Sequence, residues 1–438
     1  MKRCPQCRRD YYDDTLLYCL DDGSALLEGP SVPEDNPSES PTRQFDSPVD
    51  TSDGIDVHRT RSSTRQIRFL TIAGGVALLT IFAGVTIYFL YFRTSRPQLA
   101  GSFRELGSPA YDYYLRGKLD SDSENQEQNA NAIKILEDVV KADPTFAAAH
   151  AELARAYAIR GNDWALEGEK AKLFAEARVL SEKSLALDPN LAEGHLVRAY
   201  VMWTEAGRFP HEQAIQSLKR AVELDPNLAN AHQQLGLIYL HIGLFDKSRD
   251  ENQKAIAIDP TDTSSRLRLG LIEQYRGNYD NALTIIKTVP ADTNPAIVNR
   301  AKATLLFQLG RTEESEKVVG DFLAAYPDEG GNVTSVKAML LAKAGRADEA
   351  EAAIQRAIEI GRGYQHFHHT MYNIATAYAM MHKNDEALKW LQDTADDGFP
   401  CYPMFASDPN LIDLRSDPRF ASLMVHLKQQ WEGYKASL

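Results

Sequence analysis

The sequence predicts an all-α solenoid of about eight helix pairs, preceded by a single transmembrane helix and a small cysteine-containing module at the N-terminus. Three observations lead to this prediction. Helical phrases separated by Asp-Pro recur beyond residue 108, a long uncharged apolar run lies between Arg68 and Arg93, and three of the four cysteines fall within the first 19 residues. At 438 residues the chain is too long for a single hydrophobic core, so we expect several domains.

The charge and the motifs exclude several classes of function. A net charge of −13, from 61 acidic and 48 basic residues, gives no overall positive field for nucleic acid, so we expect no such partner. The sequence contains no glycine-rich phosphate loop, nucleophile elbow, kinase signature or His-Glu-x-x-His motif. We therefore predict a non-enzymatic protein without catalytic residues.

Residues 1–28 form the cysteine-containing module. Cys4 and Cys7 make one Cys-x-x-Cys pair, and Cys19 begins a second pair in which Asp22 takes the place of the last cysteine. Zinc prefers thiolates in structural sites but also accepts a carboxylate oxygen. We predict one structural zinc ion bound by Cys4, Cys7, Cys19 and Asp22, and the stretch resembles the short N-terminal zinc ribbons of bacterial membrane proteins. A degenerate ribbon that folds without metal is the alternative, although so small a module has little core.

Two further segments connect this module to the repeats. Residues 29–66 are rich in proline, serine and acidic residues, which predicts a disordered linker. The 24 residues from Phe69 to Phe92 carry no charge and would extend about 36 Å as a helix, enough to cross a bilayer. We predict a transmembrane helix over residues 67–92, followed by a short linker over residues 93–108.

The orientation of this helix is predicted from the flanking charges and from the thiols. Four arginines precede the span and three follow it, so the positive-inside rule favours a cytoplasmic N-terminus. Closely spaced thiols also remain reduced in the cytoplasm. We expect a single-pass protein of the cytoplasmic (inner) membrane with its repeats outside the cytoplasm.

The repeats occupy residues 109–397. Phrases such as "AVELDPNLANAHQQLGLIYLHIG" recur, with Asp-Pro at positions 143, 188, 225 and 259. Each unit has two amphipathic stretches, with proline before the first and glycine closing the turn between them, so each unit needs neighbours to bury its apolar face. About eleven extra residues after Thr145 should lengthen the helices or the turn of that unit.

This pattern resembles the tetratricopeptide repeat (TPR) family. In the unit from His232 to Pro260, the matching positions are Leu235, Gly236, Tyr239, Ala255 and Pro260, whereas Ser248 and Asn252 depart from the pattern and should loosen the local packing. Small residues recur where the two helices of a pair should approach closely: Ala154, Ala199, Gly236, Gly270, Ala303, Ala338 and Ala375.

Residues 398–438 break the period and should cap the last repeat. The ending "LRSDPRF" is similar to endings that follow TPR arrays in bacterial membrane-tethered regulators and kinases, which indicates a bacterial origin.

The TPR resemblance implies a binding surface. In that family the first helix of each unit lines a concave groove, and the inward positions of this chain mix aromatic, amide and guanidinium groups suited to an extended peptide. We predict a partner-binding groove formed by Arg155, Tyr200, Trp203, Gln233, His241, Gln274, Tyr275, Arg300 and Gln308. Trp203 and Tyr200 could instead pack against the neighbouring unit.

The remaining reactive residues are interpreted as structural. His366, His368 and His369 fall at a join between repeats, where a polar helix start is favoured over a metal site. His150, His195 and His232 share one repeat position and should be packing residues, and Cys401 should be buried.

These observations predict a membrane-anchored TPR scaffold or adaptor that binds a protein or peptide in its concave groove. The alternative is a membrane-tethered signalling or regulatory protein in which the repeats sense a ligand and the zinc ribbon is the cytoplasmic output.

Overall fold

The computed structural model describes residues 104–121, 125–163, 165, 167–204, 208–290 and 293–438, together with three short strands near the N-terminus. The chain divides into two compact units, Met1–Thr94 and Ser95–Leu438. The predicted linkers and the predicted transmembrane helix over residues 67–92 lie outside the described residues. Among the helices that are described, none is long and apolar enough to cross a membrane.

The first unit contains a small antiparallel sheet within the predicted ribbon. Its strands are β1 (Lys2–Arg3), β2 (Asp10–Tyr11) and β3 (Leu27–Glu28), in the order β2-β1-β3. Lys2 pairs with Tyr11 on one side and with Glu28 on the other. The four predicted zinc ligands lie outside the described residues, so the zinc prediction stays a prediction.

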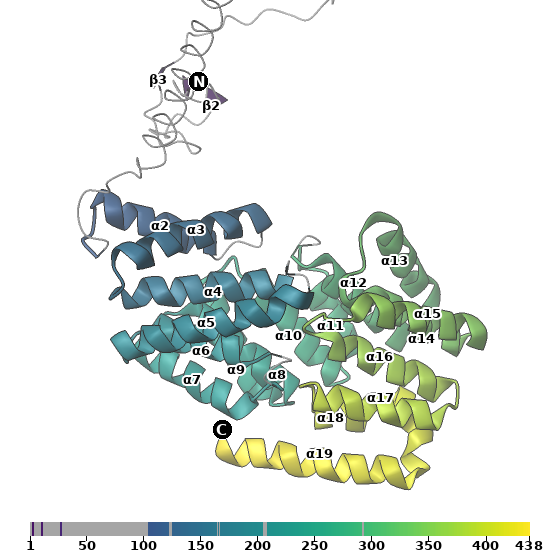
Figure 1. Cartoon of the computed structure of the whole chain (residues 1–438). Coiled ribbons are helices and arrows are strands. Elements are labelled where there is room, and N and C mark those ends of the chain that lie inside the picture. The colour runs from purple at the N-terminus through teal and green to yellow at the C-terminus, as the bar shows by residue number, and fades with distance from the viewer. Residues whose placement is uncertain are drawn as a thin grey trace, which may run out of the picture. The chain divides into compact units, whose positions relative to one another are not determined.

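The second unit is an all-α solenoid of TPR type (Figure 1). Its first eight helices are α2 (Pro109–Ser121), α3 (Gln126–Ala142), α4 (Ala147–Asp163), α5 (Glu167–Leu187), α6 (Ala192–Met202), α7 (His211–Leu224), α8 (Ala229–His241) and α9 (Phe245–Ile258). They are followed by α10 (Thr263–Tyr275), α11 (Tyr279–Ile286), α12 (Pro295–Gln308), α13 (Thr312–Ala325), η2 (Glu329–Gly331), α14 (Asn332–Lys343), α15 (Ala347–Gly361), α16 (Phe367–Met380) and α17 (Asn384–Asp396). The C-terminal elements are α18 (Tyr402–Ser407), η3 (Pro409–Ser416) and α19 (Pro418–Ser437).

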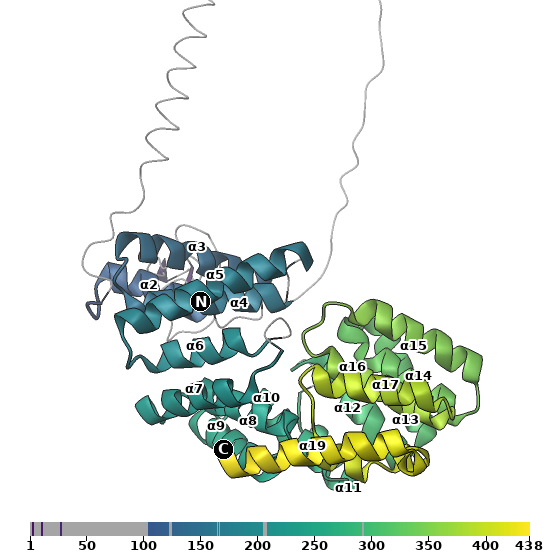
Figure 2. The ribbon, with the colours of Figure 1, turned by 60° about the horizontal axis from the view of Figure 1, so that its bottom comes forward.

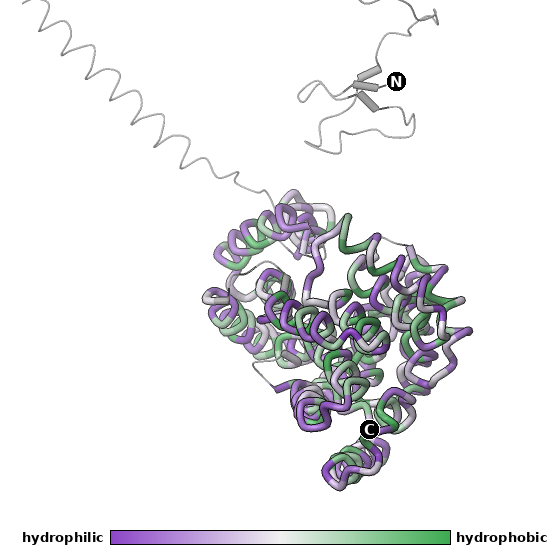
Figure 3. Tube along the Cα trace, turned by 90° about the vertical axis from the view of Figure 1, so that its right-hand side faces the viewer, coloured by the Kyte–Doolittle hydropathy of each residue, from purple (hydrophilic) through white to green (hydrophobic). Residues whose placement is uncertain are grey.

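Helices α2 to α17 pack as eight consecutive pairs in the described part of the chain, as the sequence predicts. Figure 3 shows apolar and polar residues alternating along these helices, as expected for helices that bury one face. The extra residues after Thr145 lengthen the helices of the second pair: α4 extends over 17 residues and α5 over 21.

The Asp-Pro repeat has a clear local role. Asp143, Asp225 and Asp259 each cap the end of a helix. Their carboxylates, and that of Asp188, accept a hydrogen bond from the backbone N–H two residues later, at 2.8–3.0 Å. The following proline has no N–H and disfavours helical backbone before it, so the helix ends there and the chain turns into the next pair.

The small residues lie between paired helices, as predicted. A Cβ at Gly270 would lie 2.5 Å from Ile286 Cδ1 on the partner helix, so a larger residue there would require the Ile286 side chain to move. The expected loosening at Ser248 and Asn252 is not observed. Both side chains are fully buried, Ser248 donates to the carbonyl of Gly236 at 2.7 Å, and Asn252 donates to the carbonyl of Ser248 at 2.7 Å. Hydrogen bonds replace the expected apolar contacts.

The C-terminal segment covers more than the last pair. Arg419 pairs with Asp385 on α17 at 2.7 Å, which fits the predicted cap. However, α19 continues back across the array to the third and fourth pairs (Figures 1 and 2). Lys219 on α7 donates to the backbone carbonyl of Leu438 at 2.9 Å. The C-terminal segment therefore joins the two ends of the curve formed by α6 to α17.

Candidate functional site

The predicted groove residues lie on the first helices of successive pairs, as the TPR phase requires. They are distributed over α4 (Arg155), α6 and its C-cap (Tyr200 and Trp203), α8 (Gln233 and His241), α10 (Gln274 and Tyr275) and α12 (Arg300 and Gln308). All nine residues therefore lie on the first helix of a pair or, for Trp203, at its C-cap.

Three of these residues remain partly accessible near the N-terminal end of the array. Arg155, Tyr200 and Gln233 are each half-buried. The hydroxyl of Tyr200 accepts a hydrogen bond from Asn162 at 3.1 Å, and the amide of Gln233 donates to Asp262 at 3.1 Å. These contacts orient side chains that still have exposed surface.

The middle of the predicted groove is closed by the chain itself. Tyr275 and Arg300 are only 3% and 5% exposed. The ring of Phe399, from the turn after α17, lies 5.6 Å from the ring of Tyr275 and 5.4 Å from that of His241, measured between centroids. Cys401 follows, with its Sγ 3.8 Å from the carbonyl oxygen of Leu240. An open groove was expected here, but the C-terminal segment supplies apolar side chains that occupy it.

A small polar cavity persists beneath this segment. Gln274, Tyr275, Arg300 and Gln308 line it, and its volume is about 30 Å³. Gln274 Oε1 and Arg300 Nε are buried and have no hydrogen-bond partner among the described residues. A cavity of this size has room for ordered water but not for a peptide.

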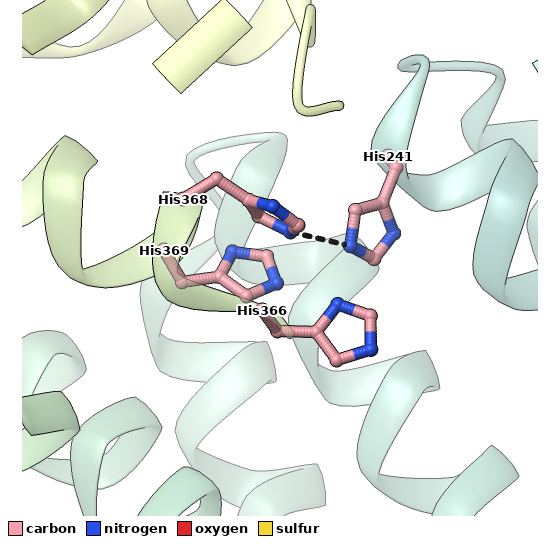
Figure 4. A group of neighbouring side chains, drawn as sticks. All are labelled: His241, His366, His368 and His369. Atoms are coloured by element: carbon pink, nitrogen blue, oxygen red, sulfur yellow. Dashed lines mark hydrogen bonds between the residues drawn. The ribbon is translucent and has the colours of Figure 1, made fainter. Parts of the chain in front are cut away.

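Beside this cavity, four histidines form a cluster. His366 is the N-cap of α16, so the expected helix start is present at the "HFHH" stretch. The stretch is nevertheless buried, because His368 is 0% and His369 is 8% exposed. They meet His241, the last residue of α8, which is 1% exposed. Ligand nitrogens of the four residues all lie within 4.8 Å of one another, and the rings surround a common space (Figure 4).

Hydrogen bonds orient two of the rings. Nδ1 of His241 donates to the carbonyl oxygen of Leu237 at 2.9 Å, which directs Nε2 of His241 toward Nε2 of His368 at 3.2 Å. On the other side of its ring, Nδ1 of His368 lies 3.3 Å from Oδ2 of Asp397. The cluster thus has both a core of imidazoles and an outer carboxylate.

The surroundings keep the imidazoles neutral. Burial lowers the pKa of His366 and of His368 to about 3, and it lowers the pKa of His241 and of His369 well below the usual value. Burial also raises the pKa of Asp397 to about 7, with a contribution from the nearby charge of Asp393. Neutral imidazole is the form that binds metal ions.

Three family models match parts of the solenoid. One described as "TPR repeat" matches residues 211–243, and two described as "Tetratricopeptide repeat" match residues 229–262 and 300–364. The chain contains tetratricopeptide repeats.

Solved TPR structures are similar to parts of this chain. A TPR protein from Parabacteroides merdae is 17% identical, with 63% of this chain and 99% of that chain covered and a TM-score of 0.43. A thermophilic TPR protein from Thermus thermophilus is 22% identical over 45% of this chain and 98% of that chain, with a TM-score of 0.34. YrrB, a TPR protein described with an unusual peptide-binding site, is 20% identical over 43% and 90%, with a TM-score of 0.29. A comparison with curated proteins finds no match.

The three histidines at one TPR position are buried, as predicted. Each also makes a hydrogen bond that the sequence did not indicate. The Nε2 atoms of His150, His195 and His232 lie 2.9–3.0 Å from the carbonyl oxygens of Pro144, Pro189 and Pro226, respectively. The histidine thus bonds to the carbonyl of the proline that precedes its own TPR helix.

Cys401 is fully buried, and burial raises the pKa of its thiol to about 12. A thiol protonated at neutral pH is a poor nucleophile, which fits the predicted packing role. Asp397 and Phe399 were not singled out from the sequence. Their only sequence signal is their position directly after the last TPR helix, at the point where the period ends.

Proposed function

We propose that this chain is a membrane-anchored TPR adaptor that binds a protein or peptide partner at the N-terminal end of its concave surface. One observation carries the proposal: Arg155, Tyr200 and Gln233 retain exposed surface. The other predicted groove residues, apart from the half-buried Gln308, are buried: Trp203, His241, Gln274, Tyr275 and Arg300. An extended peptide can use a flat aromatic anchor and charged or amide side chains of this kind.

The proposed anchor is the helix over residues 67–92, with the N-terminus in the cytoplasm. Its support is the uncharged run of residues and the arginine bias around it. A reporter that is active only in the cytoplasm should work when fused at residue 1 and fail when fused at residue 438. The reverse pattern would place the repeats in the cytoplasm.

The proposed cytoplasmic module binds one zinc ion through Cys4, Cys7, Cys19 and Asp22. A peptide of residues 1–28 should bind one Co²⁺ in place of zinc and show the near-ultraviolet charge-transfer absorbance of cobalt bound to thiolate. Asp22→Cys should tighten binding, since thiolate is the stronger structural ligand. Equal binding by Asp22→Ala would remove Asp22 from the ligand set.

Photo-crosslinking in membranes tests the binding surface. A photoreactive amino acid at position 200 of the full chain should give a discrete adduct, and Arg155→Ala should reduce its yield. The matched control places the same amino acid at position 356, an exposed site on α15, the second helix of the seventh pair. Equal adducts from both positions, or an adduct unaffected by Arg155→Ala, would contradict a partner site at the N-terminal repeats.

A further inference from the structure

The histidine cluster joins segments that are far apart in the sequence. His241 ends the first helix of the fourth pair, and His366, His368 and His369 begin the first helix of the eighth. The hydrogen bond between His241 and His368 spans 127 residues. A ligand held by all four side chains would therefore act as a link across the closed groove.

The orientation of the rings favours a cation between them. Because a carbonyl oxygen only accepts hydrogen bonds, the neutral ring of His241 carries its proton on Nδ1 and a lone pair on Nε2. Nδ1 of His368 lies 3.3 Å from Oδ2 of Asp397, and a hydrogen bond donated by Nδ1 there leaves a lone pair on Nε2 of His368. When His368 carries its proton on Nε2, it donates a hydrogen bond to Nε2 of His241 across 3.2 Å (Figure 4); when the proton is on Nδ1, both Nε2 lone pairs are available to one cation.

One nitrogen of the cluster has no partner among the described residues. Nδ1 of His366 is buried and has no hydrogen-bond partner in the described part of the chain. Burying such an atom is costly unless something pairs with it. A metal ion in the space between the rings would provide that partner.

The distances fit imidazole coordination. Zinc–nitrogen bonds are about 2.0–2.1 Å, which places the nitrogens of a tetrahedral site roughly 3.3–3.4 Å apart. The 3.2 Å between His241 and His368 is close to this value, and the other separations, up to 4.8 Å, require small side-chain rotations. Asp397 already lies where metal-bound histidines usually have a carboxylate partner.

The charged groups around the cluster have opposite effects on its affinity for a cation. Arg300 and Arg268 contribute positive potential, His211 is a neutral neighbour, and Asp397 can supply a negative charge. The two guanidinium groups reduce the affinity for a dication, so strong nitrogen ligands are needed. Imidazoles suit zinc, copper, nickel and iron, whereas magnesium and calcium require oxygen ligands.

We propose that His241, His366, His368 and His369 together bind one transition-metal ion, which links α8 to α16 and holds the closed form of the repeats. This proposal does not depend on the proposed partner surface. It assigns to the "HFHH" stretch a role that requires the contact between α8 and α16.

The test uses the full chain without a histidine tag and with Cys4, Cys7 and Cys19 changed to serine, so that the predicted ribbon site is absent. Co²⁺ is the probe, because cobalt bound only to imidazole shows d–d absorbance without thiolate charge transfer. We expect one Co²⁺ per chain, displaced by zinc but not by magnesium. Loss of the d–d absorbance in His241→Gln and in His368→Gln is expected.

Two further variants separate a ligand role from a folding role. His150→Gln changes a buried histidine outside the cluster and should keep full cobalt binding. Asp397→Asn should lower the affinity about 10–100-fold, as expected for an outer partner of a metal ligand. Helical circular dichroism confirms that each variant is folded. A folded parent that binds no cobalt, or histidine variants that bind as tightly as the parent, would overturn the proposal.

Discussion

The indole N–H of Trp431 donates to the carbonyl oxygen of Gly243 at 3.1 Å, which fastens α19 to the turn between α8 and α9. The two residues are 188 positions apart. Gly243 has φ +73°, and a Cβ there would lie 2.6 Å from Cδ of Pro403. The corresponding turn glycine of the sixth pair, Gly310, also has positive φ but has no neighbour within 4 Å of such a Cβ. Substitutions at Gly243 and Gly310 can therefore be compared to separate the effect of the contact with the C-terminal segment from the strain of the turn itself.

We predict that Gly243→Ala destabilises the chain more than Gly310→Ala does. Both substitutions strain a left-handed turn, which costs about 1–2 kcal/mol. Only Gly243→Ala also forces a methyl group against a proline ring, which adds about 1–3 kcal/mol. Urea unfolding measures the difference, and limited proteolysis should show faster cleavage after residue 398 in Gly243→Ala alone. Equal effects of the two substitutions would show that the closure contributes little stability.

A second prediction concerns the close approach of α8 and α9. A Cβ at Gly236 would lie 2.4 Å from Nδ2 of Asn252, so Gly236→Ala should cost about 1–3 kcal/mol through overpacking. In an Asn252→Ala background the space is free, and the same change should cost much less, because alanine favours helix by about 1 kcal/mol over glycine.

The free energies of unfolding of the parent, the two single variants and the double variant form the required cycle. Additive effects would mean that the two helices separate enough to admit the methyl group.

The third prediction concerns pH and compares two histidines at the same TPR position. Nδ1 of His232 lies 2.5 Å from Oε2 of Glu251, and this hydrogen bond raises the pKa of His232. Hydrogen bonds from His232 and Lys254 lower the pKa of Glu251 despite its burial. By contrast, burial lowers the pKa of His195, and the positive charge of Arg198 adds to the effect.

These opposite shifts predict opposite pH dependences. A raised folded pKa means that His232 contributes stability below the unfolded value of about 6.5, which is lost as the pH rises through the folded pKa. A lowered folded pKa means that neutral His195 contributes stability above about 6.5, which is lost as the pH falls. His232→Gln should therefore cost more at pH 5.5 than at pH 9, and His195→Gln more at pH 9. Urea midpoints at both pH values test this, and parallel trends would contradict it.

The sequence by itself determined the helix pairs and the faces they bury. Asp-Pro ends a helix through local bonds, and glycine and alanine permit close pairs, so each unit can be recognised within about 34 residues. The TPR phase also placed Tyr275 and Arg300 on the first helices of their pairs, where the structure has them.

Only the tertiary structure decided that the inner side is closed. The segment after α17 inserts Phe399 and Cys401 against α8 and α10, and α19 then crosses to the third and fourth pairs. The same return of the chain brings His241 to the histidines of α16. These contacts join residues more than 120 positions apart, and their formation depends on the accumulated curvature of several helix pairs. The local repeat in the sequence does not specify this accumulated curvature. The histidine cluster therefore could not be predicted from the sequence and is seen only in the tertiary structure.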